Sequence, residues 1–197
     1  MSKKIIFATS NQGKMKEIRE ILNEADWQVL SMKEAGIFLQ VEENGKTFEE
    51  NAIIKAKAIG EACGEIVLAD DSGLEIDYLN KEPGVYSARY MGEDTSYTVK
   101  NNYLIKRLEG VPDEARTARF VCAIAAVFPD GRELTTRATI EGRIGYEEKG
   151  SNGFGYDPIF YVPEFGKTTA ELTEEEKNRV SHRGKALELM KEELNNL

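Results

Sequence analysis

The fold is decided by the segment Ile66-Val67-Leu68-Ala69-Asp70-Asp71-Ser72-Gly73, an apolar run followed at once by two carboxylates and two turn residues. An uninterrupted apolar run of this length is typical of a strand buried on both faces of a sheet. Asp, Ser and Gly favour turns, so we expect the strand to end at Asp70 and residues 74–78 to return as a second strand. The acidic pair would then lie at the carboxyl edge of the sheet, where α/β proteins usually bind ligands.

Strand and helix patterns alternate on either side of this segment. Residues 4–8 form a β-prone run, and a polar turn separates it from a helical pattern that includes Met15. Residues 47–50 fit a capping box, which predicts a helix from there to about Cys63. The mixture predicts an α/β fold with a mixed sheet flanked by helices. Further strands are expected at 27–30, 116–128 and 133–143, and further helices at 97–108 and from 173 through 194.

The composition is that of one folded domain over residues 1–197. The 197 residues are 41% hydrophobic with a formal net charge of −9, which disfavours a nucleic-acid partner because backbone binding needs a positive surface. The sequence has no membrane-spanning stretch and no cleavage pattern near its N-terminus, so a cytoplasmic protein is expected. Two distant cysteines and a single histidine, His182, exclude a disulfide framework and a histidine-rich metal centre.

The pair Asp70-Asp71 is the strongest chemical signal in the chain. Adjacent carboxylates need a cation nearby, and their hard oxygen atoms are ligands that suit Mg²⁺. One of the two would then serve as the general base toward a water molecule. The alternative is that both residues merely start a turn, and on this segment alone the two interpretations are balanced.

Two further groups of polar residues suit phosphate chemistry. The turn over residues 9–14 leads into a helix N-terminus, whose N–H groups and dipole attract anions. Lys55 shares a helix face with Asn51 and lies downstream of Glu42 and Glu43. Each group alone is better explained as helix capping or solvated surface. Together with an acidic pair, however, they are the groups that Mg²⁺-assisted phosphoryl chemistry requires.

A glycine-rich loop at residues 151–158 suits a flat ligand. Glycines on both sides of Phe154 let the backbone approach closely, its ring can stack on a base, and Asp157 can accept hydrogen bonds. The alternative is a tight structural turn. Lys177, His182 and Arg183 can all donate to a carbonyl-bearing base or a phosphate, although a lone histidine is as readily an ordinary satisfied residue.

Six segments resemble the inosine triphosphate pyrophosphatase family. Each is weak by itself, but all six occur in the right order and span the chain. They are residues 8–14 (ATSNQGK), 48–52 (FEENA), 69–74 (ADDSGL), 83–89 (PGVYSAR), 153–158 (GFGYDP) and 181–184 (SHRG).

The resemblance implies a fold and an activity. The fold would be an elongated mixed sheet with two lobes and a central nucleotide-binding cleft, in a cytoplasmic homodimer. The activity would be the Mg²⁺-dependent hydrolysis of dITP, ITP and XTP to the monophosphate and pyrophosphate, which keeps these nucleotides out of DNA and RNA.

The resemblance also implies roles for individual residues. Asp71 would be the proton acceptor and a metal ligand, Glu42 rather than Glu43 a second metal ligand, and Lys55 a catalytic cation. The implied substrate-binding residues are Thr9, Ser10, Asn11, Gln12, Gly13 and Lys14 for the triphosphate, Ser72, and a base pocket of Phe154, Gly155, Tyr156, Asp157, Lys177, His182 and Arg183.

Two other functions stay open on the sequence alone. The first is a module that binds purine nucleotides without hydrolysing them, which would need the same pocket but no general base. The second is a related pyrophosphatase that acts on pyrimidine or modified nucleotides. The intact pair Asp70-Asp71 argues against the first, and only a comparison of substrates separates the second.

Overall fold

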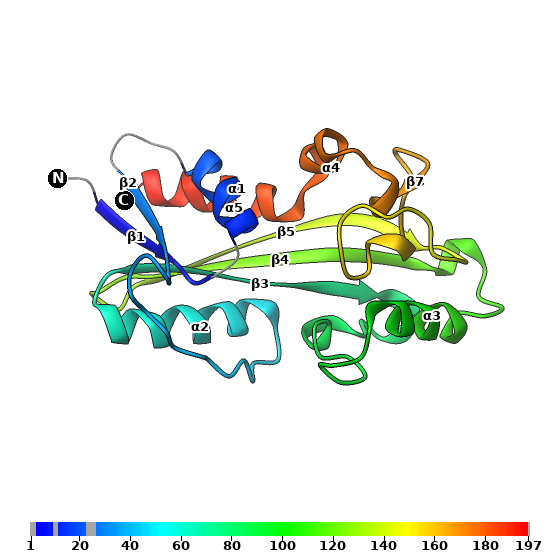
Figure 1. Ribbon diagram of the computed structural model, residues 1–197, viewed down its shortest axis with the longest axis horizontal. Helices are drawn as coiled ribbons and strands as arrows, with labels where there is room; N and C mark the ends of the chain where they lie inside the picture. Colours follow the sequence, from blue (N-terminus) through cyan, green and yellow to red (C-terminus); the bar gives the residue numbers. More distant parts are fainter. Residues whose placement is uncertain (1–2, 10–11, 23–26, 197) are drawn as a thin grey trace. The chain divides into compact units, whose positions relative to one another are not determined.

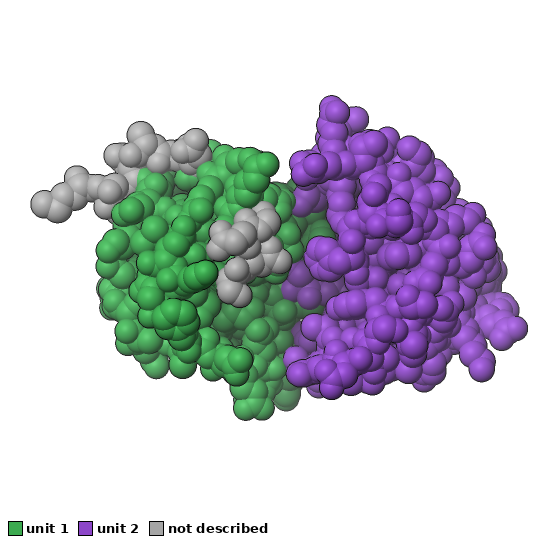
Figure 2. All heavy atoms as spheres, viewed as in Figure 1, with its two compact units in different colours: residues 1–71, 122–138, 182–197 green, residues 72–121, 139–181 purple. Residues whose placement is uncertain are grey.

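The computed structural model describes residues 3–9, 12–22 and 27–196. The chain forms two compact units, shown in different colours in Figure 2. Unit 1 comprises residues 1–71, 122–138 and 182–197, and unit 2 comprises residues 72–121 and 139–181. In the described part of the chain no helix is long and apolar enough to cross a membrane.

One mixed sheet has the strand order β2-β1-β3-β4-β5-β6-β7 (Figure 1). β1 pairs in parallel with β2 and β3, whereas β6 pairs antiparallel with β5 and β7. The predicted fold class, an α/β fold on a mixed sheet, is therefore confirmed. The strands are β1 (Lys3–Phe7), β2 (Trp27–Ser31), β3 (Ile66–Ile76), β4 (Thr117–Val127), β5 (Glu133–Ile144), β6 (Phe160–Val162) and β7 (Lys167–Thr168).

The main helices begin and end close to where the sequence predicts. The Thr47 side chain caps α2 by accepting a hydrogen bond from the Glu50 N–H, and the Glu50 carboxylate accepts one from the Lys46 N–H. At the other end, Gly64 adopts a left-handed φ of 68°, which a glycine allows without strain. The helices are α1 (Gln12–Ile21), α2 (Phe48–Cys63), α3 (Tyr97–Arg107), α4 (Glu174–Val180) and α5 (His182–Asn195).

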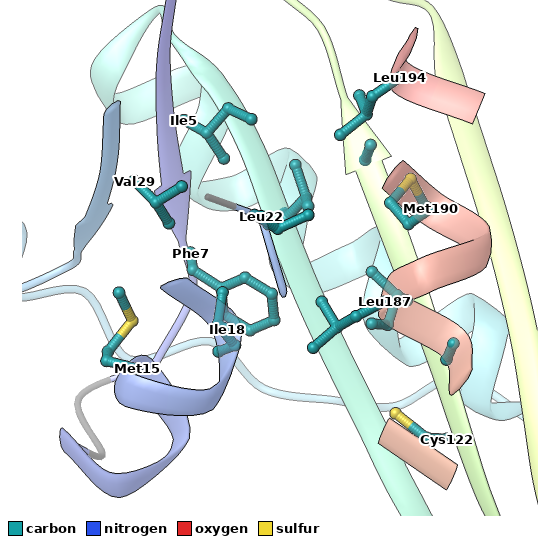
Figure 3. Packing of buried hydrophobic residues seen from close by; sticks show 14 of the residues in the cluster. Ile5, Phe7, Met15, Ile18, Leu22, Val29, Cys122, Leu187, Met190 and Leu194 are labelled. Carbon is teal, nitrogen blue, oxygen red and sulfur yellow. The ribbon is translucent and has the colours of Figure 1, made fainter. Parts of the chain in front are cut away.

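Within unit 1, helices cover both faces of the sheet. Figure 1 shows α1 and α5 on one face and α2 on the other. On the first face, Phe7 of β1 packs with side chains of α1 and α5 (Figure 3). Leu68 of β3 belongs to the same cluster. On the second face, Val67 and Ala69 of β3 pack against α2. Successive β3 residues thus alternate between two separate cores, as the pleat of a strand requires.

The structure corrects the prediction that the buried strand ends at Asp70. β3 continues without a break from Ile66 to Ile76, so residues 74–78 form no separate returning strand. The turn preference of Asp, Ser and Gly is overridden because the sheet satisfies the backbone groups, while Asp70 and Asp71 each find polar partners on their own face.

The predicted last helix, from 173 through 194, is also corrected. It is divided at Ser181 into α4 and α5, which belong to different units. Thr173 and Glu176 form a capping box at the start of α4. The apolar residue at the end of α4, Val180, is buried in the core of unit 2, and the apolar face of α5, including Leu187, is buried in the core of unit 1. The break therefore lets each helix pack on its own core.

We predict that Leu187→Ala lowers the free energy of unfolding by about 3 kcal/mol, because Leu187 is fully buried between α5 and the sheet. Urea denaturation measures the loss. Leu189→Ala is the matched control on the same helix, since Leu189 is 43% exposed, and it should change stability by no more than about 0.5 kcal/mol. Equal losses in the two variants would contradict the packing of α5.

Candidate active site

Asp70 in β3 is a buried carboxylate surrounded by cations of unit 1. Lys14 of α1 donates to its Oδ2 at 3.1 Å, and Arg183 of α5 lies 3.6 Å from the same atom. Burial opposes ionisation of this carboxyl, but the positive charges of Lys14, Arg183 and Lys55 outweigh it and lower the pKa of Asp70 to about 2. Asp70 is therefore a permanent anion that holds these cations in place.

Asp71, the next residue, has the opposite electrostatic character. Burial raises the pKa of Asp71 to about 6, helped by the negative charges of Glu43 and Asp70. A hydrogen bond from Asn51 Nδ2 at 3.0 Å and the positive charge of Lys55 act against that rise. Two neighbouring carboxyls whose pKa values are pushed apart are typical of a site with one fixed anion and one proton-accepting group.

Lys55 and Glu43 form an ion pair close to the two aspartates. Lys55 Nζ lies 2.9 Å from Glu43 Oε1 and donates to the Asp70 carbonyl at 2.8 Å. Burial of Lys55 opposes its charge, but the neighbouring carboxylates outweigh that effect and raise its pKa. The structure thus places Glu43 in this cluster, whereas Glu42 is exposed to solvent. The choice between Glu42 and Glu43 as a metal ligand stays a prediction.

These side chains line a cavity of about 250 Å³ in unit 1. Thr9, Lys14, Glu43, Lys55 and Asp70 supply its polar wall. Gln12 and Gly13 form the first turn of α1, so the helix begins where the sequence predicts a phosphate-binding turn. Of the predicted phosphate-binding residues, Ser10 and Asn11 lie outside the described residues.

In unit 2, the glycine-rich loop is organised around the buried carboxylate of Asp157. Its Oδ2 accepts hydrogen bonds from the Phe154 N–H at 2.9 Å and from Lys177 Nζ at 2.6 Å. Its Oδ1 accepts from the Thr169 hydroxyl at 2.8 Å. Gly153 has a φ of +73°, and a Cβ there would lie 2.1 Å from Asp157 Oδ2. Any other residue at 153 would therefore displace the carboxylate.

The same loop displays one aromatic ring and buries the other. Phe154 is 72% exposed, and Lys177 Nζ lies 5.6 Å from the centroid of its ring. Tyr156 is buried instead, and its hydroxyl donates to the Ser87 carbonyl at 2.7 Å. Only the ring of Phe154 is thus presented to a ligand, with a cation beside it.

Comparison with known proteins decides the family. The model described as Ham1 family matches residues 5–193. The chain belongs to the Ham1 family. A curated relative from Desulforamulus reducens, named dITP/XTP pyrophosphatase, is 54% identical over 98% of this chain and 96% of its own length. A Bacillus subtilis relative with the same name is 49% identical over 94% and 93%.

Solved structures of Ham1 proteins have the same fold. The Staphylococcus aureus Ham1 protein superposes with a TM-score of 0.91 at 43% identity, covering 98% of this chain and 99% of that one. A Ham1 protein from Coxiella burnetii gives 0.92 at 41% identity, covering 99% and 100%. The resemblance found in the six sequence segments is thereby confirmed.

The predicted site residues of this Ham1 chain fall into two groups. Those for the phosphates, with Asp71 and Lys55, belong to unit 1, and Phe154, Asp157 and Lys177 belong to unit 2. Ser72 follows Asp71 in β3. His182 and Arg183, predicted for the base pocket, begin α5 in unit 1. Since Arg183 lies against Asp70 and Glu17, its contacts group it with the phosphate residues.

Asp70, Asn51 and Thr169 contribute contacts to the site but were not among the predicted site residues. The sequence analysis treated Asp70 as one member of the acidic pair and gave it no role of its own. In a continuous strand, however, the side chains of Asp70 and Asp71 must point to opposite faces of the sheet. Asn51, which donates to Asp71, had a usable signal in its position four residues before Lys55. Thr169 had no sequence signal, because only the folded chain brings it to Asp157.

We predict that Asp71→Asn raises the free energy of unfolding of the metal-free protein at pH 7 by about 2 kcal/mol. Between about pH 4 and pH 6 the folded chain keeps the Asp71 proton that the unfolded chain releases, so wild-type stability falls as pH rises through that window. The variant has no carboxyl group at position 71, so its free energy of unfolding should not fall in this way. Its stability relative to the wild type should therefore increase over the same pH range. Urea denaturation in EDTA at several pH values measures the difference.

Asp70→Asn is the matched control and should show the opposite sign. The lowered pKa of Asp70 stabilises the fold above about pH 4, and this contribution fades as pH falls toward 2. At pH 7 the variant should lose about 3 kcal/mol, because Lys14 and Arg183 lose a buried counter-ion. Effects of the same sign at positions 70 and 71 would refute the assignment of one fixed anion and one proton acceptor.

Proposed function

We propose that this protein hydrolyses the non-standard purine nucleotides dITP, ITP and XTP to the monophosphate and pyrophosphate, and so keeps them out of DNA and RNA. The observation that carries the proposal is the geometry of the acidic pair: Asp70 lies against Lys14 and Arg183, whereas Asp71 accepts a hydrogen bond from Asn51. The lowered pKa of Asp70 and the raised pKa of Asp71 agree with this arrangement. The names of the relatives support the substrate class.

Asp71 would act as the general base. Its pKa near 6 leaves it ionised at neutral pH yet basic enough to take a proton from water as that water attacks the α-phosphorus. Asn51 Nδ2 holds the Asp71 carboxylate in one orientation. The leaving group is pyrophosphate, so its growing negative charge must be balanced by cations.

Lys14 and Lys55 would supply that balance in the cavity of unit 1. Both ammonium groups are held by Asp70, the first through its carboxylate and the second through its carbonyl. The predicted turn, with Ser10, Asn11, Gln12 and Gly13, would add backbone N–H groups at the start of α1. Held cations need little reorganisation as charge develops on the phosphates, which favours catalysis.

The donor set suits a divalent cation of the Mg²⁺ type. Asp71 and Glu43 lie close enough for the charge of Glu43 to raise the pKa of Asp71, a repulsion that a bound cation would relieve. Across the described residues, no three His, Cys, Asp or Glu side chains gather into a metal cage. Mg²⁺ commonly takes one or two carboxylates and completes its shell with water and phosphate oxygens. When bound, it would supply charge neutralisation and a more acidic water.

The base would be recognised by the loop of unit 2. The exposed ring of Phe154 offers a stacking surface, and Lys177 offers a donor for the 6-oxo group of hypoxanthine or xanthine. Adenine presents a 6-amino donor instead, which would leave the donors of the pocket unpaired. The roles of His182 and Arg183 toward the base stay predictions.

We also infer, from the family resemblance, that the protein is a cytoplasmic homodimer that binds no nucleic acid. The formal charge of −9 supports the last point. Light scattering tests the dimer.

We predict metal-dependent pyrophosphate release from dITP, ITP and XTP far above that from dATP, dGTP, dTTP and dUTP. Each nucleotide is assayed with Mg²⁺ and with EDTA, and Asp71→Asn should lose about a thousandfold in kcat because the general base is gone. Strong turnover of dUTP or dTTP would overturn the substrate class. Tight ITP binding without hydrolysis would instead favour a nucleotide-binding module.

We predict that Glu43→Gln raises the Mg²⁺ concentration needed for half-maximal turnover of dITP by about tenfold or more. Glu42→Gln, at the adjacent exposed position, is the matched control and should behave as the wild type. Titration of initial rates with Mg²⁺ compares them. A defect confined to the Glu42 variant would restore Glu42 as the ligand.

A further inference from the structure

Asn101 of α3 is a buried amide that contacts the base-recognition loop, residues 153–157. It is 1% exposed, and its Nδ2 donates to the Gly155 carbonyl at 3.2 Å and to Glu148 Oε1 at 2.8 Å. Both neighbours are acceptors, so the amide can face them only through its nitrogen. The contacts themselves therefore fix the orientation of the amide.

The other end of this amide is costly to bury. None of the described residues donates to Asn101 Oδ1, and a buried acceptor without a donor destabilises a fold. An apolar side chain at this helix position would avoid the cost. The stability of α3 alone therefore does not explain an asparagine here, whereas the bond to Gly155 does.

α3 supports the loop with an aromatic ring as well. The ring of Tyr97 packs edge-on against Tyr156 with centroids 5.2 Å apart. It also lies directly under Gly155, 3.5 Å from where a Cβ would be. Lys100 ties the helix to the neighbouring segment by donating to the Ala88 carbonyl at 2.7 Å. The side chains of α3 thus pack against the loop and support it.

The exposed Phe154 needs such support because both of its neighbours are glycines. Gly153 and Gly155 have φ values of +73° and +66°, and glycine restrains its own backbone less than any other residue. Asp157 holds the Phe154 N–H on one side. Asn101 holds the Gly155 carbonyl on the other.

We propose that Asn101 is a positioning residue for base selection, which fixes the Gly155 carbonyl and thereby the placement of the Phe154 ring against the purine. This inference rests on the proposed function and deepens it. Asn101 does not touch the reacting atoms, so its loss should weaken recognition of the correct base more than it slows the chemical step. Small misplacements of a binding surface are enough for such effects.

The test compares Asn101→Ala with Asn102→Ala, the next residue of the same helix. Asn102 is exposed and donates to the Thr98 carbonyl within α3. We expect Asn101→Ala to raise KM for dITP by about tenfold with a smaller change in kcat, and to lower the preference for dITP over dGTP by a similar factor. Asn102→Ala should match the wild type in both.

A second variant and a second readout separate positioning from simple stability. Asn101→Leu has a side chain of similar size without the N–H donors and buries no unpaired acceptor, so it should share the selectivity defect even if Asn101→Ala folds poorly. Hydrogen–deuterium exchange of residues 153–157 should rise in both Asn101 variants and stay unchanged in Asn102→Ala. Lower thermal stability with unchanged selectivity and unchanged exchange in this loop would overturn the proposal.

Failure of the proposed function would be visible separately. If the wild-type protein hydrolyses none of the purine nucleotides, that function is wrong, and the role of Asn101 is then decided by loop exchange and by titration with IMP. Faster loop exchange with at least tenfold weaker IMP binding in Asn101→Ala would still support positioning. Unchanged exchange, or IMP binding that is equal in the two proteins or absent from both, would overturn it.

Discussion

The candidate site depends on the pleat of one strand. Because β3 continues through the acidic pair, Asp70 and Asp71 must point to opposite faces. One face carries α1 and α5, which supply Lys14 and Arg183 to Asp70. The other face carries α2, which supplies Asn51 to Asp71. Two chemically identical side chains thereby acquire different pKa values.

This arrangement explains why the cations of unit 1 stay ordered. Lys14, Lys55 and Arg183 would repel one another, but the buried anion of Asp70 attracts all three. Asp71 is then left to burial and to the nearby charge of Glu43, which raise its pKa. The fixed anion and the proton acceptor are therefore two consequences of the same alternation.

In unit 2 the important feature is how the glycine-rich loop at residues 153–157 is restrained. The glycines around Phe154 allow a sharp path that other residues would not adopt, but they supply no restraint of their own. Restraint comes from side chains distant in sequence, with Asp157 fixed by Thr169 and Lys177, and Gly155 fixed by Asn101. The proposed catalytic electrostatics and the proposed base recognition would thus rest on different interactions, each within its own unit.

The sequence by itself determined most of the longer strands and helices, the α/β class and the family, because hydrophobic periodicity, helix caps and short motifs are local properties of the chain. It also located Asp71, Lys55, Lys14 and the Phe154 loop. Only the tertiary structure decided that β3 passes through the acidic pair and that the last helix is divided at Ser181. It also decided that Glu43 rather than Glu42 faces Lys55, and that Arg183 meets Asp70. These outcomes depend on which side chains distant in sequence meet on each face of the sheet, and in these places such contacts outweigh local turn and helix preferences.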